Sequence, residues 1–252
     1  NFFGVIGFRY DSKDKSGERA DADTKVGQAL NVRQFYLGYT AGNTTIQAGR
    51  QVLGTFFTDD IVATGLKVAV NPVEGLTLAG VYYTNFEEDG DLGGIPFNDG
   101  SSAYIHQKNL WGAAAIYQNE FLDLQAWYAG LNQVANLFAI SAGANYPIND
   151  AVTVRGKAQW AHTNLAGKFK DNYRLVPGAE STVANSNFFG FDLGASFYGF
   201  DLDAGYLTYG KKDQISVHTL EDAGSLIKPG EELLNYTAFT GKHKVWFGTA
   251  AY

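Results

Sequence analysis

The stretch FFGFDLGASFYGFDLDAGYLTYG, residues 188–210, shows how the chain folds. Apolar residues stand at every second position from 189 to 197 and again from 200 to 206. This period of two is typical of β-strands with two unlike faces. Tyr198-Gly199 separates the two halves as a tight turn, and the opposite face carries glycines, a serine and aspartates. The stretch therefore predicts a hairpin with one apolar face and one polar face.

The same alternation continues along most of the chain. In residues 152–160, valine, alanine and tryptophan alternate with threonine, arginine, lysine and glutamine. Many such segments reach about ten residues, which is longer than the strands of soluble sheets and matches the roughly 9–11 residues of a tilted membrane crossing. About twelve strands are expected. They lie at 1–12, 29–41, 44–53, 63–71, 76–87, 108–118, 121–132, 134–147, 151–164, 186–199, 200–213 and 243–252.

The connections between these strands differ in length on the two sides. Short turns alternate with long polar connections, which is the layout of a transmembrane barrel. Aromatic residues stand near many strand ends, as in the girdles of a wall that faces lipid. The sequence thus predicts an all-β, transmembrane, antiparallel up-and-down β-barrel, with residues 1–252 as one domain. A soluble β-sandwich is the alternative fold, but it leaves the charges of the second face unexplained. The long connections are expected at 12–28, 88–107, 165–185 and 214–242.

Composition excludes several other classes. The chain has 252 residues, a formal net charge of −7, no Cys and no Met. The negative charge argues against a nucleic-acid binder, which needs a basic face. The lack of cysteine excludes disulfides and thiolate metal sites. No apolar run is long enough for a membrane helix.

Four segments carry a resemblance to a known family. VRQFYLGYTAGNTTIQAGRQVL (32–53) resembles Gram-negative trimeric porins. TDDIVATGLKVAVNPVEGLTLAGVYYTNF (58–86), LWGAAAIYQNEFLDLQAWYAGLNQVANLFAISAGANY (110–146) and YGKKDQISVHTLEDAGSLIKPGEELLNYT (209–237) are similar to the major outer membrane porin of Campylobacter and its relatives. The resemblance implies an eighteen-stranded barrel, a homotrimer and a water-filled pore in the bacterial outer membrane. It also implies that these residues lack strands at both ends of the natural chain.

The expected function is passive diffusion of small hydrophilic solutes and ions, without covalent chemistry. No HExxH motif, phosphate-binding loop or paired histidine spacing occurs. A substrate-selective channel is the alternative within the same class. An outer-membrane lipase barrel and a soluble β-sandwich binding module are the alternatives from other classes.

Charged residues on the polar face are candidates for the pore lining. Arg155 and Lys157 lie on that face of their strand, and facing lipid at the midplane would cost each about 2–4 kcal/mol. Arg33 and Arg50 share the parity of apolar neighbours, so they either follow a β-bulge or lie at the rim. The basic candidates are Arg9, Arg33, Arg50, Lys67, Arg155 and Lys157, and the acidic ones are Asp123, Asp192, Asp201 and Asp203.

The connection NFEEDGDLGGIPFNDGSSAYIHQK, residues 85–108, is acidic and rich in glycine. In porins the corresponding loop folds into the barrel and narrows it, whereas the alternative is a solvated acidic loop. Candidates for this constriction are Glu87, Glu88, Asp89, Asp91 and Asp99.

The resemblance also implies a Ca²⁺ site in the lumen. The matching positions are Asp60, Asp91 and Glu221, with Asp59 as the alternative to Asp60. Carboxylate oxygens are the ligands that Ca²⁺ prefers. The expected partners besides solutes are outer-membrane lipid and lipopolysaccharide, whose phosphates suit the basic residues at the loop bases, and no nucleic acid. Those basic residues are Lys168, Lys170, Arg174, Lys211 and Lys212.

Overall fold

The computed structural model describes residues 1–10, 30–87, 108–174, 183–229, 236–237 and 239–252. The expected all-β fold is confirmed, because twelve strands form one antiparallel sheet in which each strand pairs with the next along the chain. The strands are β1 (Phe2–Tyr10), β2 (Leu30–Ala41), β3 (Thr44–Val52), β4 (Val62–Val73), β5 (Leu76–Phe86), β6 (Leu110–Gln118), β7 (Leu122–Leu131), β8 (Ala135–Asn149), β9 (Val152–Leu165), β10 (Ser186–Phe197), β11 (Phe200–Ser216) and β12 (Phe239–Ala251).

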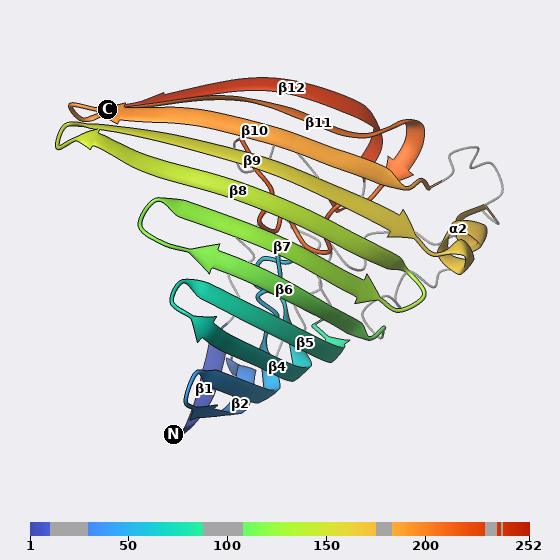
Figure 1. The fold of residues 1–252 in the computed structure, drawn as a ribbon. Coiled ribbons are helices and arrows are strands. Elements are labelled where there is room, and N and C mark those ends of the chain that lie inside the picture. Colours follow the sequence, from blue (N-terminus) through green and yellow to red (C-terminus); the bar gives the residue numbers. More distant parts are fainter. Residues whose placement is uncertain (11–29, 88–107, 175–182, 230–235, 238) are drawn as a thin grey trace.

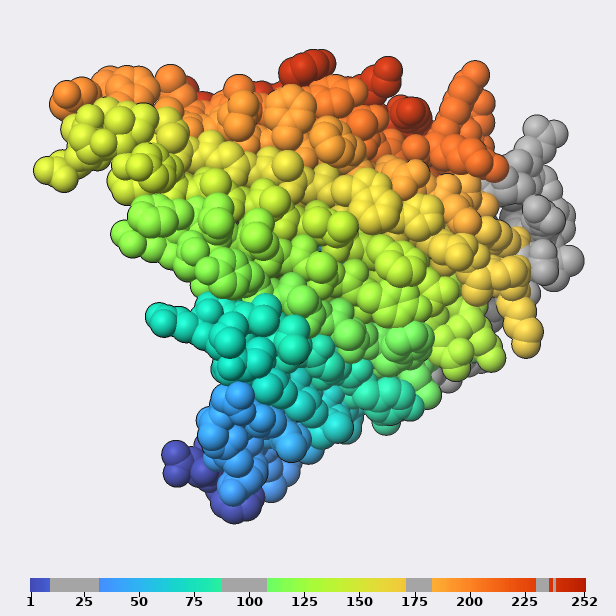
Figure 2. Space-filling view, viewed as in Figure 1, coloured from blue at the N-terminus to red at the C-terminus, as the bar shows by residue number. Residues whose placement is uncertain are grey.

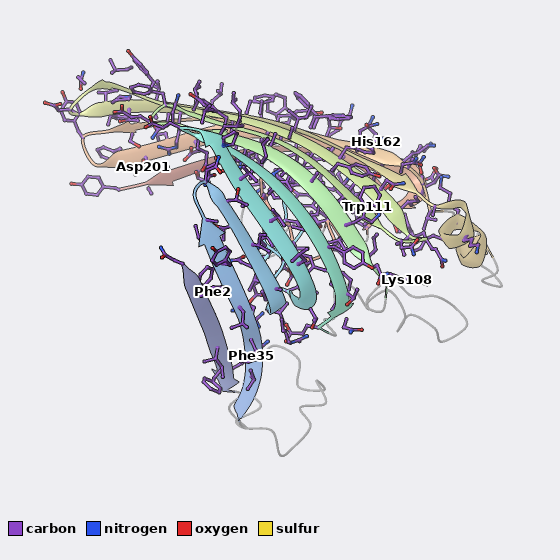
Figure 3. The ribbon with its side chains drawn as sticks, turned by 60° about the horizontal axis from the view of Figure 1, so that its bottom comes forward. Phe2, Phe35, Lys108, Trp111, His162 and Asp201 are labelled. Carbon is purple, nitrogen blue, oxygen red and sulfur yellow. The ribbon has the colours of Figure 1, made fainter. Side chains whose placement is uncertain are left out.

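The sheet is a curved wall with a concave side (Figures 1 and 3). Within the described residues β1 pairs with β2 alone and β12 with β11 alone. Asp201 marks the end of the wall that carries the short turns, and Lys108 marks the end that carries the long connections (Figure 3). A short helix, α2 (Gly167–Arg174), lies in the connection between β9 and β10, where the sequence predicted only a loop. In the described part of the chain, no helix has both the length and the apolar character that a membrane crossing requires.

The outward face of the sheet is apolar and exposed. Leu193 is 62% exposed and Ile140 is 54% exposed, although both lie in the middle of long strands. Figure 2 shows this face as a continuous surface of side chains over β4 to β11. A wide exposed apolar face on a long-stranded sheet fits contact with lipid, so the apolar half of residues 188–206 faces outward as the sequence predicted.

The concave face has two zones, whereas the alternation predicted a polar face throughout. Near the turn end its residues are charged, among them Arg155, Asp123 and Asp203. Near the long-connection end they are apolar and fully buried, as at Phe188 and Leu207. Two inner segments, residues 53–61 and 217–229, supply the apolar partners that cover this second zone.

Replacing Phe188 with alanine is expected to lower the free energy of unfolding by about 3–5 kcal/mol, as for other buried aromatic side chains. Its ring is fully buried and lies against the rings of Tyr209, His218 and Tyr236. The matched control is Phe189→Ala, because Phe189 points to the opposite face and is 43% exposed. Guanidinium unfolding in detergent measures both, and equal losses for the two variants would contradict the assignment of the faces.

Candidate functional site

The two inner segments are joined to each other on the concave side of the sheet, behind the strands in the view of Figure 1. The amide of Leu220 donates to the carbonyl of Phe57 at 2.8 Å, and the amide of Ser225 donates to that of Phe56 at 2.8 Å. Gly224 makes this approach possible, since its φ is +51° and a Cβ there would come within 2.5 Å of the Phe56 carbonyl oxygen. The segments therefore form one plug-like unit.

Gln159 on β9 ties this unit to the wall. Its amide nitrogen donates to the carbonyl of Ser225 at 2.8 Å, and its amide oxygen accepts from the amide of Ile227 at 2.7 Å. The side chain is almost fully buried, so both bonds are shielded from water. The sequence showed Gln159 only as one more polar-face residue.

The inner position of residues 53–61 was not predicted either. Residues 54–61 were expected as the gap between two strands, and the resemblance placed only Asp60 in the lumen. The apolar content of this segment was the available signal, because large apolar side chains in a connection need a partner to bury them. Leu53, Phe56, Phe57 and Ile61 are all buried.

Glu221 connects the two inner segments through its carboxylate. Oε2 accepts hydrogen bonds from the backbone amides of Asp59 and Ile61, both at 2.9 Å. The side chain is 2% exposed, and this burial raises the pKa of Glu221 to about 7. The two amide donors oppose the rise in pKa, whereas the nearby Asp60 carboxylate adds to it. Glu221 therefore holds residues 59–61 in place and titrates near neutral pH.

A cluster of charges lies where the inner segments meet β1, β2 and β5. Arg33 Nη2 is 2.9 Å from Asp60 Oδ2, and Arg33 Nε is 3.6 Å from Glu87 Oε2. Arg9 Nη1 lies 3.8 Å from Glu87 Oε1. The hydrogen bond from Arg33 holds the pKa of Asp60 below its ordinary value. The cluster thus places two cations and two carboxylates at one level of the concave face.

A β-bulge brings Arg33 into this cluster. The register between β1 and β2 shifts at Gly7 and Phe8, which pair with Gln34 and Val32, so Arg33 is the extra residue. An extra residue reverses the parity of the side chains that follow. Of the two alternatives drawn from the sequence for Arg33, the structure has the bulge.

Arg50 does not join the cluster. It pairs directly with Phe35, which is 61% exposed on the outward face, and directly opposed residues share a face. Its guanidinium donates to the carbonyl of Asn85 at 3.5 Å, near the end of β5. Lys67 lies inward, and its ammonium donates to the carbonyl of Val52 at 3.3 Å.

A second charged cluster lies at the turn end. Arg155 makes a bidentate pair with Asp203, with Nε to Oδ1 at 2.9 Å and Nη2 to Oδ2 at 2.7 Å. It also reaches Asp201 at 3.2 Å and Ser196 at 2.6 Å, and Ser196 donates to Asp201. These residues come from β9, β10 and β11, so the network links three strands across the wall. The next row of charged residues, further from the turn end, consists of Asp123 on β7, Lys157 on β9 and Asp192 on β10.

The structure brings together two of the three expected calcium ligands. Asp60 and Glu221 lie within hydrogen-bonding reach of each other, whereas Asp91 falls outside the described residues, as do Glu88, Asp89 and Asp99. Two adjacent carboxylates repel unless a proton or a cation lies between them. Oxygen donors of this kind suit Ca²⁺, so Asp60 and Glu221 fit the ion as a pair. The described residues contain no group of three or more acidic or histidine side chains that could hold a metal ion.

One hydroxyl and imidazole pair occurs in the described part of the chain, Ser186 Oγ and His218 Nε2 at 3.3 Å. Both side chains are buried, and the His218 ring packs against the rings of Phe188 and Phe239. Burial lowers the pKa of His218 well below its ordinary value. Their burial among aromatic rings fits a packed core.

Solved structures of outer-membrane channels share this fold. OccAB2 of Acinetobacter baumannii matches with a TM-score of 0.62 and 15% identity over 93% of this chain and 62% of its own. OccK8 (OprE) of Pseudomonas aeruginosa matches with a TM-score of 0.56 and 15% sequence identity. The match covers 69% of this chain and 49% of OccK8. OccAB3 of A. baumannii matches with a TM-score of 0.54 and 12% sequence identity. The match covers 70% of this chain and 44% of OccAB3. This chain therefore spans about half the length of such channels.

The sequence comparisons give a narrower result. No protein with a curated description matches the chain. The family model described as Campylobacter major outer membrane protein matches residues 1–252, which is the whole chain. The barrel-wall fold and the placement in the bacterial outer membrane are therefore as the sequence predicted, and the chain belongs to the Campylobacter major outer membrane protein family.

Proposed function

We propose that the protein forms a water-filled channel for passive diffusion of small hydrophilic solutes and ions. The observation that carries this proposal is the contrast between the two faces, with exposed apolar residues outside and charged clusters of both signs inside. A concave wall with opposed charges orients and sorts solutes by the field across the pore. The family membership supports the same function.

Conductance in planar bilayers tests the proposal. The complete natural protein is expected to give stepwise KCl conductance, and liposome swelling with graded sugars separates a general pore from a substrate-selective one. A protein that inserts without conductance contradicts the channel. A protein that stays monodisperse in water without detergent contradicts the membrane channel.

The homotrimer remains part of the proposal. Its support is the resemblance to trimeric porins. Cross-linking in detergent is expected to give a ladder that ends at three subunits. Lipopolysaccharide is the proposed lipid partner, with Lys168 and Lys170 of α2 as candidate contacts at the long-connection end.

Calcium binding is proposed at Asp60 and Glu221, which would hold the ion between residues 53–61 and 217–229. Because the Glu221 carboxyl must lose its proton to act as a ligand and its pKa is about 7, calcium competes with a proton. We expect the apparent calcium affinity to be about tenfold higher at pH 8 than at pH 6. Isothermal titration at the two pH values measures this.

The control for the calcium prediction is Asp201→Asn, which removes a carboxylate at the opposite end of the wall and should leave the affinity unchanged. Glu221→Gln should abolish the pH dependence. Equal affinity at both pH values, or no heat of binding at either, would contradict the site.

A further inference from the structure

One row of residues crosses five strands of the concave face just above the turn end. Gln118 pairs with Asp123, Asp123 with Gly143, Gly143 with Lys157, and Lys157 with Asp192. Directly paired residues share a face, so these side chains lie side by side on the wall. The row therefore places a carboxylate on either side of one ammonium.

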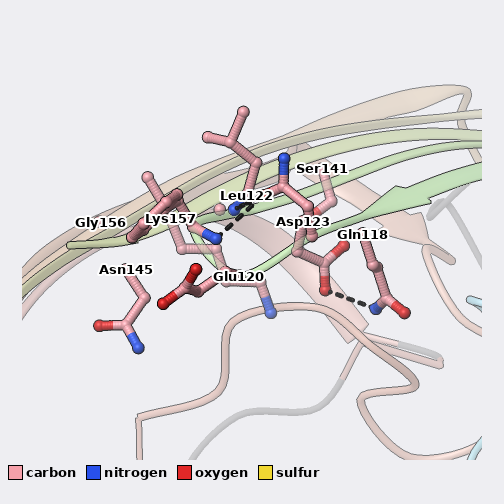
Figure 4. A pocket seen from close by; sticks show the side chains of 12 residues that line it. Gln118, Glu120, Leu122, Asp123, Ser141, Asn145, Gly156 and Lys157 are labelled. Atoms are coloured by element: carbon pink, nitrogen blue, oxygen red, sulfur yellow. Dashed lines mark hydrogen bonds between the residues drawn. The ribbon is translucent and has the colours of Figure 1, made fainter. Parts of the chain in front are cut away.

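A glycine leaves a gap in this row between Asp123 and Lys157. A Cβ added at Gly143 would make ordinary van der Waals contact with Asp123 Cβ at 3.7 Å, so glycine leaves only the space beyond that position unfilled by a side chain. This space belongs to a cavity of about 490 Å³, whose lining includes Glu120, Asp123, Asn145 and Lys157 (Figure 4). Its size admits a small solute.

The Asp123 carboxylate is held in position on one side of the gap. Its Oδ2 accepts from the amide of Gln118 at 3.1 Å, and its Oδ1 accepts from the amide of Gln125 at 2.9 Å. Trp127 in turn donates to Gln125 at 2.9 Å. The donors to Asp123 are neutral, so they orient the charge without cancelling it.

The Lys157 ammonium lies on the other side, where it is attracted by the Asp123 and Asp192 carboxylates without direct contact. Within the described residues it makes no ion pair within 4.0 Å and no hydrogen bond, and the side chain is exposed to the lumen. Arg155, two residues earlier on the same strand, is bound by Asp203, Asp201 and Ser196. Arg155 is therefore a structural cation, whereas the Lys157 ammonium is available to a solute.

We propose that the gap over Gly143 binds small zwitterions that pass through the channel, such as amino acids and short peptides. The carboxylate of the solute lies at Lys157 and its ammonium group at Asp123. A simple anion would meet Asp123, Asp192 and Glu120 as repelling neighbours, and a simple cation would be repelled by Lys157. A solute with both charges pairs with both signs and matches the wall better than either ion. This inference deepens the proposed function and rests on it.

The test is conductance of the complete natural channel in planar bilayers. L-glutamine, a zwitterion, is expected to reduce the KCl current in a saturable way, whereas arabinose, a neutral solute of similar size, reduces it only in proportion to viscosity. Lys157→Met and Asp123→Asn should each raise the half-blocking concentration of glutamine about fivefold or more. Lys157→Arg should keep the block, because it keeps the cation.

Matched controls and a third variant separate binding from folding. Lys108→Met and Asp213→Asn remove the same charges at the long-connection end and should leave the block unchanged. Gly143→Leu keeps both charges but fills the gap, so it should abolish the block while KCl conductance persists. Circular dichroism in detergent reports whether each variant keeps its strands.

Three outcomes overturn the inference. Absence of any KCl conductance overturns the channel and the site together. Normal KCl conductance with a glutamine effect no larger than that of arabinose overturns the site alone. Block by propionate that equals the block by glutamine and is unaffected by Asp123→Asn shows a simple anion site instead.

Discussion

Replacing Glu221 with alanine is expected to release the inner segments and raise the single-channel conductance. The substitution leaves the amides of Asp59 and Ile61 without their acceptor. An unsatisfied buried donor costs about 1–3 kcal/mol. The Ile61 bond is buried and the Asp59 bond is part-buried, so the local opening of residues 53–61 becomes easier by about 2–4 kcal/mol. The lower figure corresponds to a roughly thirtyfold increase in the open population.

Two measurements check the Glu221 prediction together. Hydrogen exchange of residues 53–61 is expected to speed up by about thirtyfold or more, because exchange reports local opening. Glu221→Gln is the matched control, since its amide oxygen can take the place of Oε2 and accept from both amides, and it should keep the exchange close to that of the natural protein. Unchanged exchange in Glu221→Ala would mean that the burial of Phe56 and Phe57 holds residues 53–61 without the carboxylate.

Replacing Arg33 with alanine is expected to make the channel more selective for cations. Arg33 and Arg9 balance Asp60 and Glu87 at one level of the wall, so the substitution leaves a net negative charge there. A unit charge about 8 Å from the path of an ion changes its energy by about 0.5 kcal/mol in water and more at lower dielectric. The ratio of cation to anion permeability should therefore rise at least about twofold.

The reversal potential in a KCl gradient measures this ratio. Arg50→Ala is the matched control, because Arg50 lies on the outward face and its loss should leave the reversal potential unchanged. Arg33→Lys should keep the natural value. The effect of Arg33→Ala should shrink at high salt, where screening is strong, and a shift of the same size in Arg50→Ala would refute the assignment of the faces.

The sequence already contained the strands, their faces and the family. The period of two in residues 188–206 and 152–160 predicted which side chains point outward, and the structure agrees, since Leu193, Phe189 and Trp160 are exposed. This information is local, because each residue's face follows from its neighbours along one strand. The resemblance to Campylobacter porins likewise needed only contiguous segments, and it proved right over residues 1–252.

The candidate site was predicted less completely. The sequence named Arg33, Asp60, Glu87 and Glu221 individually, but their meeting depends on the bulge at Arg33 and on the inward course of residues 53–61. In the sequence, Arg33 and Arg50 both alternate in step with the apolar residues of their strands, so the pattern predicted the same face for both. In the structure they lie on different faces. A bulge is defined by the partner strand, so no pattern within one strand reveals it.

The sequence by itself determined the twelve strands, the face of most side chains, the apolar wall and the family, because these follow from residues close together in the chain. The tertiary structure decided the two zones of the concave face, the joining of residues 53–61 to 217–229 by Glu221, and the row that opposes Asp123 to Lys157 across Gly143. These features depend on register and on contacts between residues far apart in the chain, such as Asp59 and Glu221, which are 162 positions apart. Such contacts form, and stabilise the fold, only when the sheet is assembled. The alternation of residues along a single strand therefore cannot predict them.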